Sequence, residues 1–211
     1  MTDIPSPDQA PSAFVRELTE VVRPTPRRLS MLARDLTVSA DEEGLIAIAY
    51  TTVDTPVGSL LLCATTTGLL RVAFDVEGHR EVLDRLADAV SPLILRNPKR
   101  LDPVMRELDD YFAGRRRSFD VPLDRRLSKG FQRTVLEHLP DIPYGATATY
   151  ASVAAASGSP RAVRAVGTAC ATNPLPVVVP CHRVVRSDGT DGRYRGGEAA
   201  KRVLLDLEAT A

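Results

Sequence analysis

The sequence VVPCHRV, at residues 178–184, decides how this chain is interpreted, because it sets a cysteine, a histidine and an arginine between apolar residues. The thiolate is the reactive form of cysteine, and cationic neighbours favour it where the site stays partly accessible. Cys181 has two such neighbours in the sequence, His182 and Arg183. The motif therefore predicts chemistry at the sulfur of Cys181.

The imidazole of His182 needs a geometry other than direct contact with the thiol. Adjacent side chains on a helix or a strand do not face one another, so we expect a water molecule to bridge Cys181 and His182. A third group, usually an acid, must then hold the tautomer of the imidazole, and Glu208 is the candidate. The structural alternative makes Cys181 a small buried hydrophobic residue and His182 a surface residue.

Further motifs surround the cysteine in a defined order. PYGATATY (143–150), SPRAVRAVG (159–167) and Asn173-Pro174 precede it, and YRGG (194–197), Lys201 and LLDLE (204–208) follow it. This order and spacing resembles the O6-alkylguanine-DNA alkyltransferases, or methylated-DNA–protein-cysteine methyltransferases. The resemblance is close over residues 131–208, looser over 46–123 and absent from 1–45.

The resemblance implies an α+β fold in three parts. Residues 1–45 form an N-terminal extension of unknown role. Residues 46–125 form a small antiparallel sheet domain, which is ribonuclease H-like in the family. Residues 126–211 form a mostly helical domain of the winged-helix, helix-turn-helix kind, which binds DNA and accepts the alkyl group.

The resemblance also implies a reaction, which is irreversible transfer of an alkyl group from O6-alkylguanine to Cys181, with O4-alkylthymine as a further substrate. The alkylated base is rotated out of double-stranded DNA, and each protein molecule reacts once without a cofactor or a metal. His182 and Glu208 form a relay through water, and Tyr150 donates a hydrogen bond to the base. Asn173 braces the turn before the active-site segment.

Two further groups of residues follow from the same family. Arg164 is the residue that intercalates where the base has left the stack, and Tyr194 lines the alkyl pocket. Arg161 and Arg195 are expected to contact the DNA backbone or solvent. Tight helix packing is the alternative for the small residues, and a core position is the alternative for Tyr194. The other expected DNA contacts are Ala162, Gly167 and Thr149, and the other expected pocket residues are Arg195, Gly196, Lys201, Val179 and Pro180.

Composition limits the class of protein and its surroundings. The chain has 211 residues, 44% of them hydrophobic, which suffices for one large or two small globular domains. Residues 126–211 carry 11 Lys or Arg against 7 Asp or Glu, a net charge of +4, while residues 1–125 carry 16 against 20, a net charge of −4. A basic half suits a phosphate-binding face, although an ordinary solvated surface explains it as well.

The expected surroundings follow from the cysteines and from the absence of signals. Three cysteines give no even disulfide framework, and no secretion signal or bilayer-length apolar segment is found. We expect a monomer in the cytoplasm, or in the nucleus of a eukaryote, that does not bind membranes.

Hydrophobic periodicity predicts the elements. Strands are expected at 46–52, 60–64 and 68–74, and helices at 79–90, 103–112, 131–139, 150–156 and 160–171. Gly114 is expected to end the second helix, and Ser159 to cap the last one, after the turn at Gly158. Two short N-terminal helices, around 14–22 and 29–36, are expected to pack against the rest of the protein rather than to dock a partner.

Three positions depart from the resembled family. Leu136 replaces a common tryptophan, Asp191 an apolar residue, and Arg193 a small or amide residue. The first predicts altered core packing, and the others affect lesion preference and DNA affinity. Two other functions stay open: a non-catalytic helix-turn-helix regulator, which would not need the thiol, and a cysteine hydrolase, which would need a more distant histidine.

Overall fold

The computed structural model describes residues 25–190 and 192–210, and it divides into two units, residues 1–43 and 44–211. The described part of the first unit is helix α2 (Pro26–Glu42), which Thr25 caps by accepting a hydrogen bond from Arg28 N at 3.3 Å. No residue of α2 is buried within this unit, and the packing expected of this segment stays a prediction. The helix expected around 14–22 lies outside the described residues.

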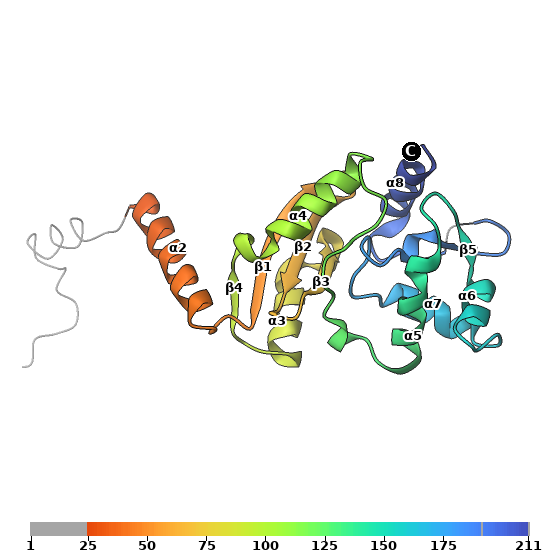
Figure 1. Cartoon of the computed structure of the whole chain (residues 1–211), viewed down its shortest axis with the longest axis horizontal. Helices are drawn as coiled ribbons and strands as arrows, with labels where there is room; N and C mark the ends of the chain where they lie inside the picture. Colours follow the sequence, from red (N-terminus) through yellow and green to blue (C-terminus); the bar gives the residue numbers. More distant parts are fainter. Residues whose placement is uncertain (1–24, 191, 211) are drawn as a thin grey trace, which may run out of the picture. The chain divides into compact units, whose positions relative to one another are not determined.

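The second unit begins with a four-stranded sheet (Figure 1). Its strand order is β3-β2-β1-β4, with β1 at Ile48–Thr55, β2 at Gly58–Ala64, β3 at Leu69–Phe74 and β4 at Ile94–Arg96. The three predicted strands pair antiparallel, as expected. The three-residue β4 was not predicted, and it pairs in parallel with β1, so the sheet is mixed rather than purely antiparallel.

Both faces of this sheet are covered, because its central strands are apolar on each side. Leu60 and Leu62 face a core that includes Leu108 of helix α4 (Pro98–Phe112). Leu61 and Cys63 face a second core formed with helix α3 (His79–Ala89). Short 3-10 turns follow at η1 (Asp75–Glu77) and η2 (Arg125–Leu127).

Helix α4 corrects one predicted boundary. It begins at Pro98, five residues before the predicted start at Pro103, and Pro103 lies inside the helix. Proline at the first turn is favourable, since its missing N–H would have no partner there, and Pro98 rather than Pro103 takes that role. The predicted end is confirmed: Gly114 follows the last turn with φ +71°, a conformation that glycine adopts without steric cost.

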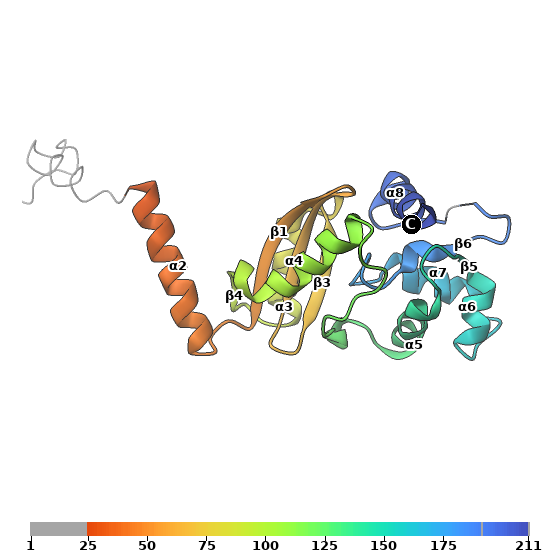
Figure 2. The same cartoon turned by 45° about the horizontal axis from the view of Figure 1, so that its top comes forward.

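The helical part follows the sheet and carries the rest of the second unit (Figure 2). The core on the α4 face of the sheet continues into it, through Val135, Val153 and Val166. Leu136 is buried in this core. Among the described residues, no helix is long and apolar enough to cross a membrane. The elements are α5 (Gly130–His138), η3 (Leu139–Asp141), β5 (Ala148–Thr149), α6 (Tyr150–Ala156), α7 (Val163–Ala171), η4 (Cys181–Arg183), β6 (Val184–Val185) and α8 (Gly197–Ala209).

Helices α6 and α7 pack against each other and are joined by a tight turn, as the helix-turn-helix prediction requires. Gly158 makes the turn with φ +73°, and Ser159 N bonds back to Ala154 O at 2.9 Å. The predicted start of α7 is wrong by three residues. Ser159 does not cap the helix; its carbonyl accepts from Ala162 N in a separate turn, and α7 begins only at Val163.

Candidate active site

A single buried carboxylate, that of Glu208 on α8, joins four segments of the chain. Its Oε1 accepts hydrogen bonds from His182 Nε2 at 2.9 Å, from Tyr111 Oη at 2.7 Å and from Arg183 Nη2 at 2.9 Å. Its Oε2 accepts from Arg183 Nε at 2.8 Å and from Gly145 N at 3.3 Å. These donors and the positive charge of Arg183 favour the ionised form against the cost of burial.

Burial raises the pKa of Glu208, but hydrogen bonds from His182, Arg183 and Tyr111 outweigh it, and the net result is a pKa of about 2. The carboxylate is therefore ionised at neutral pH and can only accept hydrogen bonds. It follows that His182 Nε2 carries the proton in this contact. The predicted pairing of Glu208 with His182 is present in the structure.

His182 is completely buried and neutral. Burial lowers its pKa, and the nearby cations Arg183 and Lys201 lower it further, although Glu208 acts in the opposite direction. Since Nε2 donates to Glu208, Nδ1 keeps its lone pair. Among the described residues, Nδ1 has no hydrogen-bond partner. His182 thus presents a free acceptor nitrogen, which is what a general base needs.

Cys181 lies at the start of η4 and is buried, with 3% of its surface exposed. Its Sγ accepts a hydrogen bond from Asn173 Nδ2 at 3.1 Å. The same amide nitrogen donates to Val179 O at 2.9 Å, and Asn173 Oδ1 accepts from Leu175 N at 2.9 Å. Asn173 therefore braces the backbone before the cysteine, the role expected for it, and it also contacts the sulfur, which was not expected.

The two neighbours of Cys181 in the sequence, His182 and Arg183, direct their hydrogen bonds to other groups than the thiol. Both residues bond to Glu208, and Arg183 also donates to Ile142 O at 2.7 Å. Burial raises the pKa of the Cys181 thiol to about 11, against the opposing effects of Asn173, Lys201 and Arg195. The free protein therefore holds a neutral thiol at physiological pH, which must lose its proton as it reacts.

The segment between Asn173 and Cys181 is strained at one residue. Val177 has φ +71°, which is unfavourable for a β-branched side chain and costs about 1–3 kcal/mol. Its neighbours Val178, Val179 and Pro180 are buried, so packing holds the conformation. Val179 and Pro180 thus shape the backbone that presents the thiol. Sequence reasoning did not predict this strain.

Tyr194 is the aromatic residue beside the site. Its ring packs edge-on against His182 and against Phe74, with centroid distances of 6.4 and 5.6 Å. Burial, and then the neighbouring Cys181, raise the pKa of its hydroxyl. The backbone of Gly196 also lies against the Phe74 ring, because a Cβ there would lie 2.6 Å from that ring. Tyr194 therefore packs as a core aromatic residue and also lies next to the thiol, so these two interpretations of the residue do not exclude each other.

Three other predicted site residues, Tyr150, Lys201 and Arg195, each contact a different part of the chain. Tyr150, the first residue of α6, has its hydroxyl against the backbone of Gly192. Lys201 is buried and donates to Val184 O at 2.7 Å. Arg195 does not face solvent freely, as it pairs with Glu77 of η1. The Arg195 side chain keeps 30% of its surface exposed, and Glu77 is a neighbour that sequence reasoning missed.

The predicted DNA contacts lie along the helix-turn-helix, and the two arginines among them are exposed. Arg161 lies in the turn before α7, and Arg164 lies in its first turn; both are exposed. Val166, Ala169 and Cys170 form the opposite, buried side of α7. Thr149 has a structural role, since its hydroxyl caps α6 by accepting from Ser152 N at 3.1 Å. The partly exposed Ala162 and Gly167 leave little side chain between this helix and a ligand.

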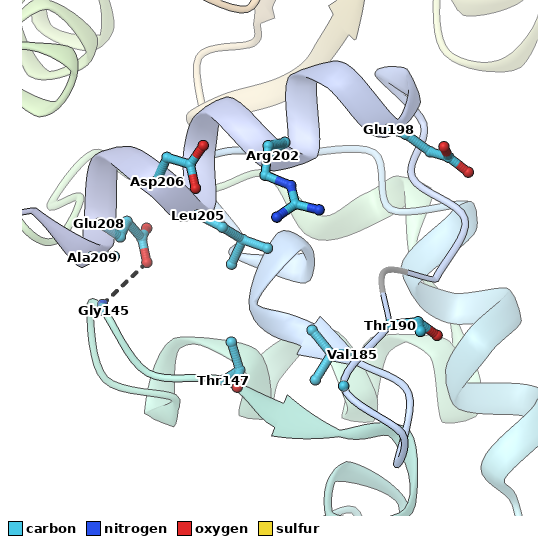
Figure 3. Close-up of a pocket in the computed structure, with 11 residues that line it drawn as sticks. Gly145, Thr147, Val185, Thr190, Glu198, Arg202, Leu205, Asp206, Glu208 and Ala209 are labelled. Carbon is cyan, nitrogen blue, oxygen red and sulfur yellow. Dashed lines mark hydrogen bonds between the residues drawn. The ribbon is translucent and has the colours of Figure 1, made fainter.

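Gly145 of the PYG motif has a physical reason to be glycine. Its φ is +77°, and a Cβ there would lie 2.9 Å from Glu208 O. Figure 3 shows Gly145 beside the end of α8, where its N–H reaches the Glu208 carboxylate. A pocket of about 670 Å³ opens there, between α8 and the loops around Thr147 and Thr190. Glu208 lines this pocket, whereas Cys181 does not.

A neutral, buried thiol beside a histidine–carboxylate pair, together with a helix-turn-helix, defines the class as a cysteine-dependent protein with a nucleic-acid-binding module. Comparison with known proteins agrees. Residues 48–125 match the ribonuclease-like domain of 6-O-methylguanine DNA methyltransferase, and residues 130–210 match its DNA binding domain.

Individual relatives support the same assignment. The chain is 38% identical to a methylated-DNA–protein-cysteine methyltransferase of Methanosarcina barkeri, over 75% of this chain and 96% of that protein. It is 36% identical to the constitutive methyltransferase of that name from Bacillus subtilis, over 75% and 94%. The chain belongs to the 6-O-methylguanine DNA methyltransferase family.

Solved structures show the shared fold. The O6-methylguanine methyltransferase of Mycobacterium tuberculosis is 35% identical and superimposes with a TM-score of 0.69, covering 77% of this chain and 93% of that one. Mycobacterium tuberculosis OGT in complex with DNA is 36% identical, with a TM-score of 0.66 and the same coverage. The α+β fold predicted from sequence is thereby confirmed.

The first prediction concerns the stability that Glu208 provides. Its pKa is lowered in the folded protein, so its contribution is complete above the ordinary value of 4.5 and is lost as the pH falls from there toward 2. Glu208→Gln leaves Arg183 buried without its counter-ion, and we expect a cost of about 3–5 kcal/mol in the free energy of unfolding at pH 7. Urea unfolding at pH 7 and at pH 3 measures it.

The matched control is Glu137→Gln, which removes a carboxylate from an exposed ion pair with Arg133. Such pairs contribute about 0–1 kcal/mol, so this variant should unfold nearly as the wild type does. The difference between wild type and Glu208→Gln should shrink at pH 3. A difference that stays constant from pH 7 to pH 3 would contradict the assigned ionisation.

Proposed function

We propose that this protein repairs DNA by direct reversal. Cys181 takes the alkyl group from O6 of a guanine in double-stranded DNA, with O4-alkylthymine as a second substrate, and keeps it. The surroundings of Cys181 carry the proposal. Its buried thiol accepts a hydrogen bond from Asn173, and the next residue, His182, is held through its Nε2 by Glu208. The names of the relatives agree with this activity.

The thiol must lose its proton for the reaction, and His182 supplies the base. Since Nε2 donates to Glu208, Nδ1 accepts the thiol proton through a bridging water, and the carboxylate stabilises the imidazolium that forms. The new S–C bond forms as the C–O6 bond breaks. The electron pair of the broken bond goes to guanine, which gains a proton, and Tyr150 donates the hydrogen bond that stabilises this leaving group.

The product explains why each molecule reacts once. A thioether has no carbonyl for water to attack, unlike an acyl-enzyme. Cys170 is a second thiol in the electrostatic neighbourhood of Cys181, but burial raises its pKa far above the ordinary value, so it offers no thiolate to attack the alkyl group. The protein is therefore consumed in proportion to the lesions removed.

Duplex DNA has to be opened before the base reaches a buried thiol, and unstacking one nucleotide costs a few kcal/mol. The exposed face of α7 suits this step because its residues are small apart from Val163, Arg164 and Thr168. The planar guanidinium of Arg164 would fill the space that the base leaves. Arg161 would contact a phosphate from the preceding turn.

The cysteines of the chain bear on the compartment in which the protein works. Cys63, Cys170 and Cys181 are free and buried, which suits a reducing compartment. We propose a monomer that works in the cytoplasm, or in the nucleus if the source is eukaryotic.

The second prediction tests the acceptor. The protein is mixed with a duplex that carries O6-methylguanine labelled in its methyl group, and peptide mass spectrometry then locates the label. We expect one methyl group per protein molecule, on Cys181, because the side chain of Asn173 hydrogen-bonds to this thiol at the start of η4. Cys181→Ala should take up no label.

Cys170→Ala is the matched control, since Cys170 is a buried thiol on α7 whose pKa is raised further by burial. This variant should still methylate Cys181 stoichiometrically. Label on another residue, or repeated turnover on excess duplex, would overturn the proposed function.

The third prediction concerns base rotation. Arg164→Ala should slow methyl transfer from duplex DNA at least tenfold, because unstacking by a few kcal/mol then goes uncompensated. Transfer from the same lesion in single-stranded DNA should change by about threefold or less, since little stacking is lost there. Single-turnover rates on the two substrates measure the difference.

Arg161→Ala provides the comparison, as it removes an exposed arginine of the same helix-turn-helix. It should weaken duplex binding, with a smaller effect on the saturated rate. Equal losses on duplex and single strand for Arg164→Ala would exclude the intercalating role.

A further inference from the structure

The ion pair between Arg195 and Glu77 belongs to a larger buried cluster. The Glu77 carboxylate, 8% exposed, also accepts from Arg71 Nη2, so that one anion serves two guanidinium groups. Its other oxygen, Oε1, accepts from Phe74 N at 3.1 Å. The cluster connects β3 and η1, on the sheet, to the start of α8.

One arm of this cluster reaches Tyr194. Arg195 Nε donates to Glu77 Oε2, and the preceding residue, Tyr194, packs on both Phe74 and His182. The following residue, Gly196, lies so close to Phe74 that no Cβ fits. The chain from 194 to 196 is therefore held against the sheet by an ion pair, a ring contact and a backbone contact in succession.

The other arm reaches Asn173. Arg71, only 5% exposed, donates from Nη1 to Pro174 O at 2.9 Å, and Val72 N donates to the same carbonyl at 2.9 Å. Pro174 directly follows Asn173, whose amide holds the sulfur of Cys181. A displacement of Pro174 would therefore move the only described side chain that hydrogen-bonds to the thiol.

We infer that Glu77 is a positioning residue for alkyl transfer: through Arg195 and Arg71, its buried carboxylate fixes the two segments that place Tyr194 and Asn173 around Cys181. This inference rests on the proposed function and adds a role for the sheet domain in it. Glu77 has no contact with Cys181 in the structure, so it acts through the two arginines. The sheet thereby sets the geometry of a reaction that takes place in the helical domain.

The test measures single-turnover methyl transfer from an O6-methylguanine duplex by the full-length protein, at increasing protein excess. Glu77→Gln should lower the saturated rate about tenfold, because small displacements of reacting groups are costly. The protein concentration at half-saturation should stay within about twofold, since none of the hydrogen bonds and ion pairs of Glu77 described above involves α7. A variant that merely loses DNA binding would show the opposite pattern.

A double-mutant cycle separates positioning from general stability. Arg195→Ala, at a partly exposed side chain, should also lower the saturated rate. Glu77→Gln should lower the saturated rate by a smaller factor in the Arg195→Ala background than in the wild type, because the contact between Glu77 and Arg195 is already lost there. Glu77→Asp should keep more of the rate than Glu77→Gln, and Glu137→Gln should react as the wild type does.

Several outcomes overturn the inference while leaving the proposed function intact. A wild-type rate for Arg195→Ala would do so, even if Glu77→Gln failed to fold. Equal fold-losses from Glu77→Gln with and without Arg195 would also do so, because the two residues would then act independently. If the wild-type protein itself transferred no methyl group to Cys181, the proposed function would fail instead.

Discussion

The site depends on one constraint, which is that the buried carboxylate of Glu208 must be surrounded by donors. An unpaired charge at 3% exposure would cost several kcal/mol, so the fold has to bring Arg183, His182, Tyr111 and the Gly145 N–H to the same point. These groups come from α4, the loop before β5, and η4, while Glu208 itself comes from α8. Satisfying one carboxylate thus fixes how the sheet domain, the helical domain and the C-terminal helix meet.

This constraint also explains the protonation states of the reactive groups. The positive charge of Arg183 is neutralised by Glu208, so it is not available to ionise Cys181. Burial then keeps the thiol protonated and His182 neutral in the free protein. A neutral thiol beside a neutral base is stable until a substrate arrives, which suits the single reaction that we propose for each molecule.

The sequence allowed much of the site to be predicted, because its contacts are local or motif-based. Adjacency alone indicated that His182 does not face Cys181 and needs an acid to hold it, and the structure shows Glu208 in that contact. The strands β1 to β3 and the helix-turn-helix were predictable from periodicity and from Gly158. Strand β4 was missed because three residues are too few to show a period of two.

The partners supplied by the sheet domain could not be predicted. Tyr111 lies 97 residues from Glu208 in the sequence, and Glu77 lies 118 residues from Arg195. Neither shows a local signal, since Tyr111 fits the apolar face of α4 and Glu77 resembles any acid in a turn. The start of α4 was misplaced because Pro103 was given the role that Pro98 has. Long-range pairing and the choice between two prolines are settled by tertiary packing.

The most direct test of this account is the ionisation of Glu208 itself. A ¹³C NMR titration of glutamate side-chain carboxyl groups, with the Glu208 resonance assigned by its absence in Glu208→Gln, reports the pKa of this one group. The account predicts no protonation of Glu208 between pH 7 and pH 4 and a midpoint of about 2. A midpoint at or above the ordinary value of 4.5 would mean that the carboxylate is not the charged centre of the site, and would contradict the account.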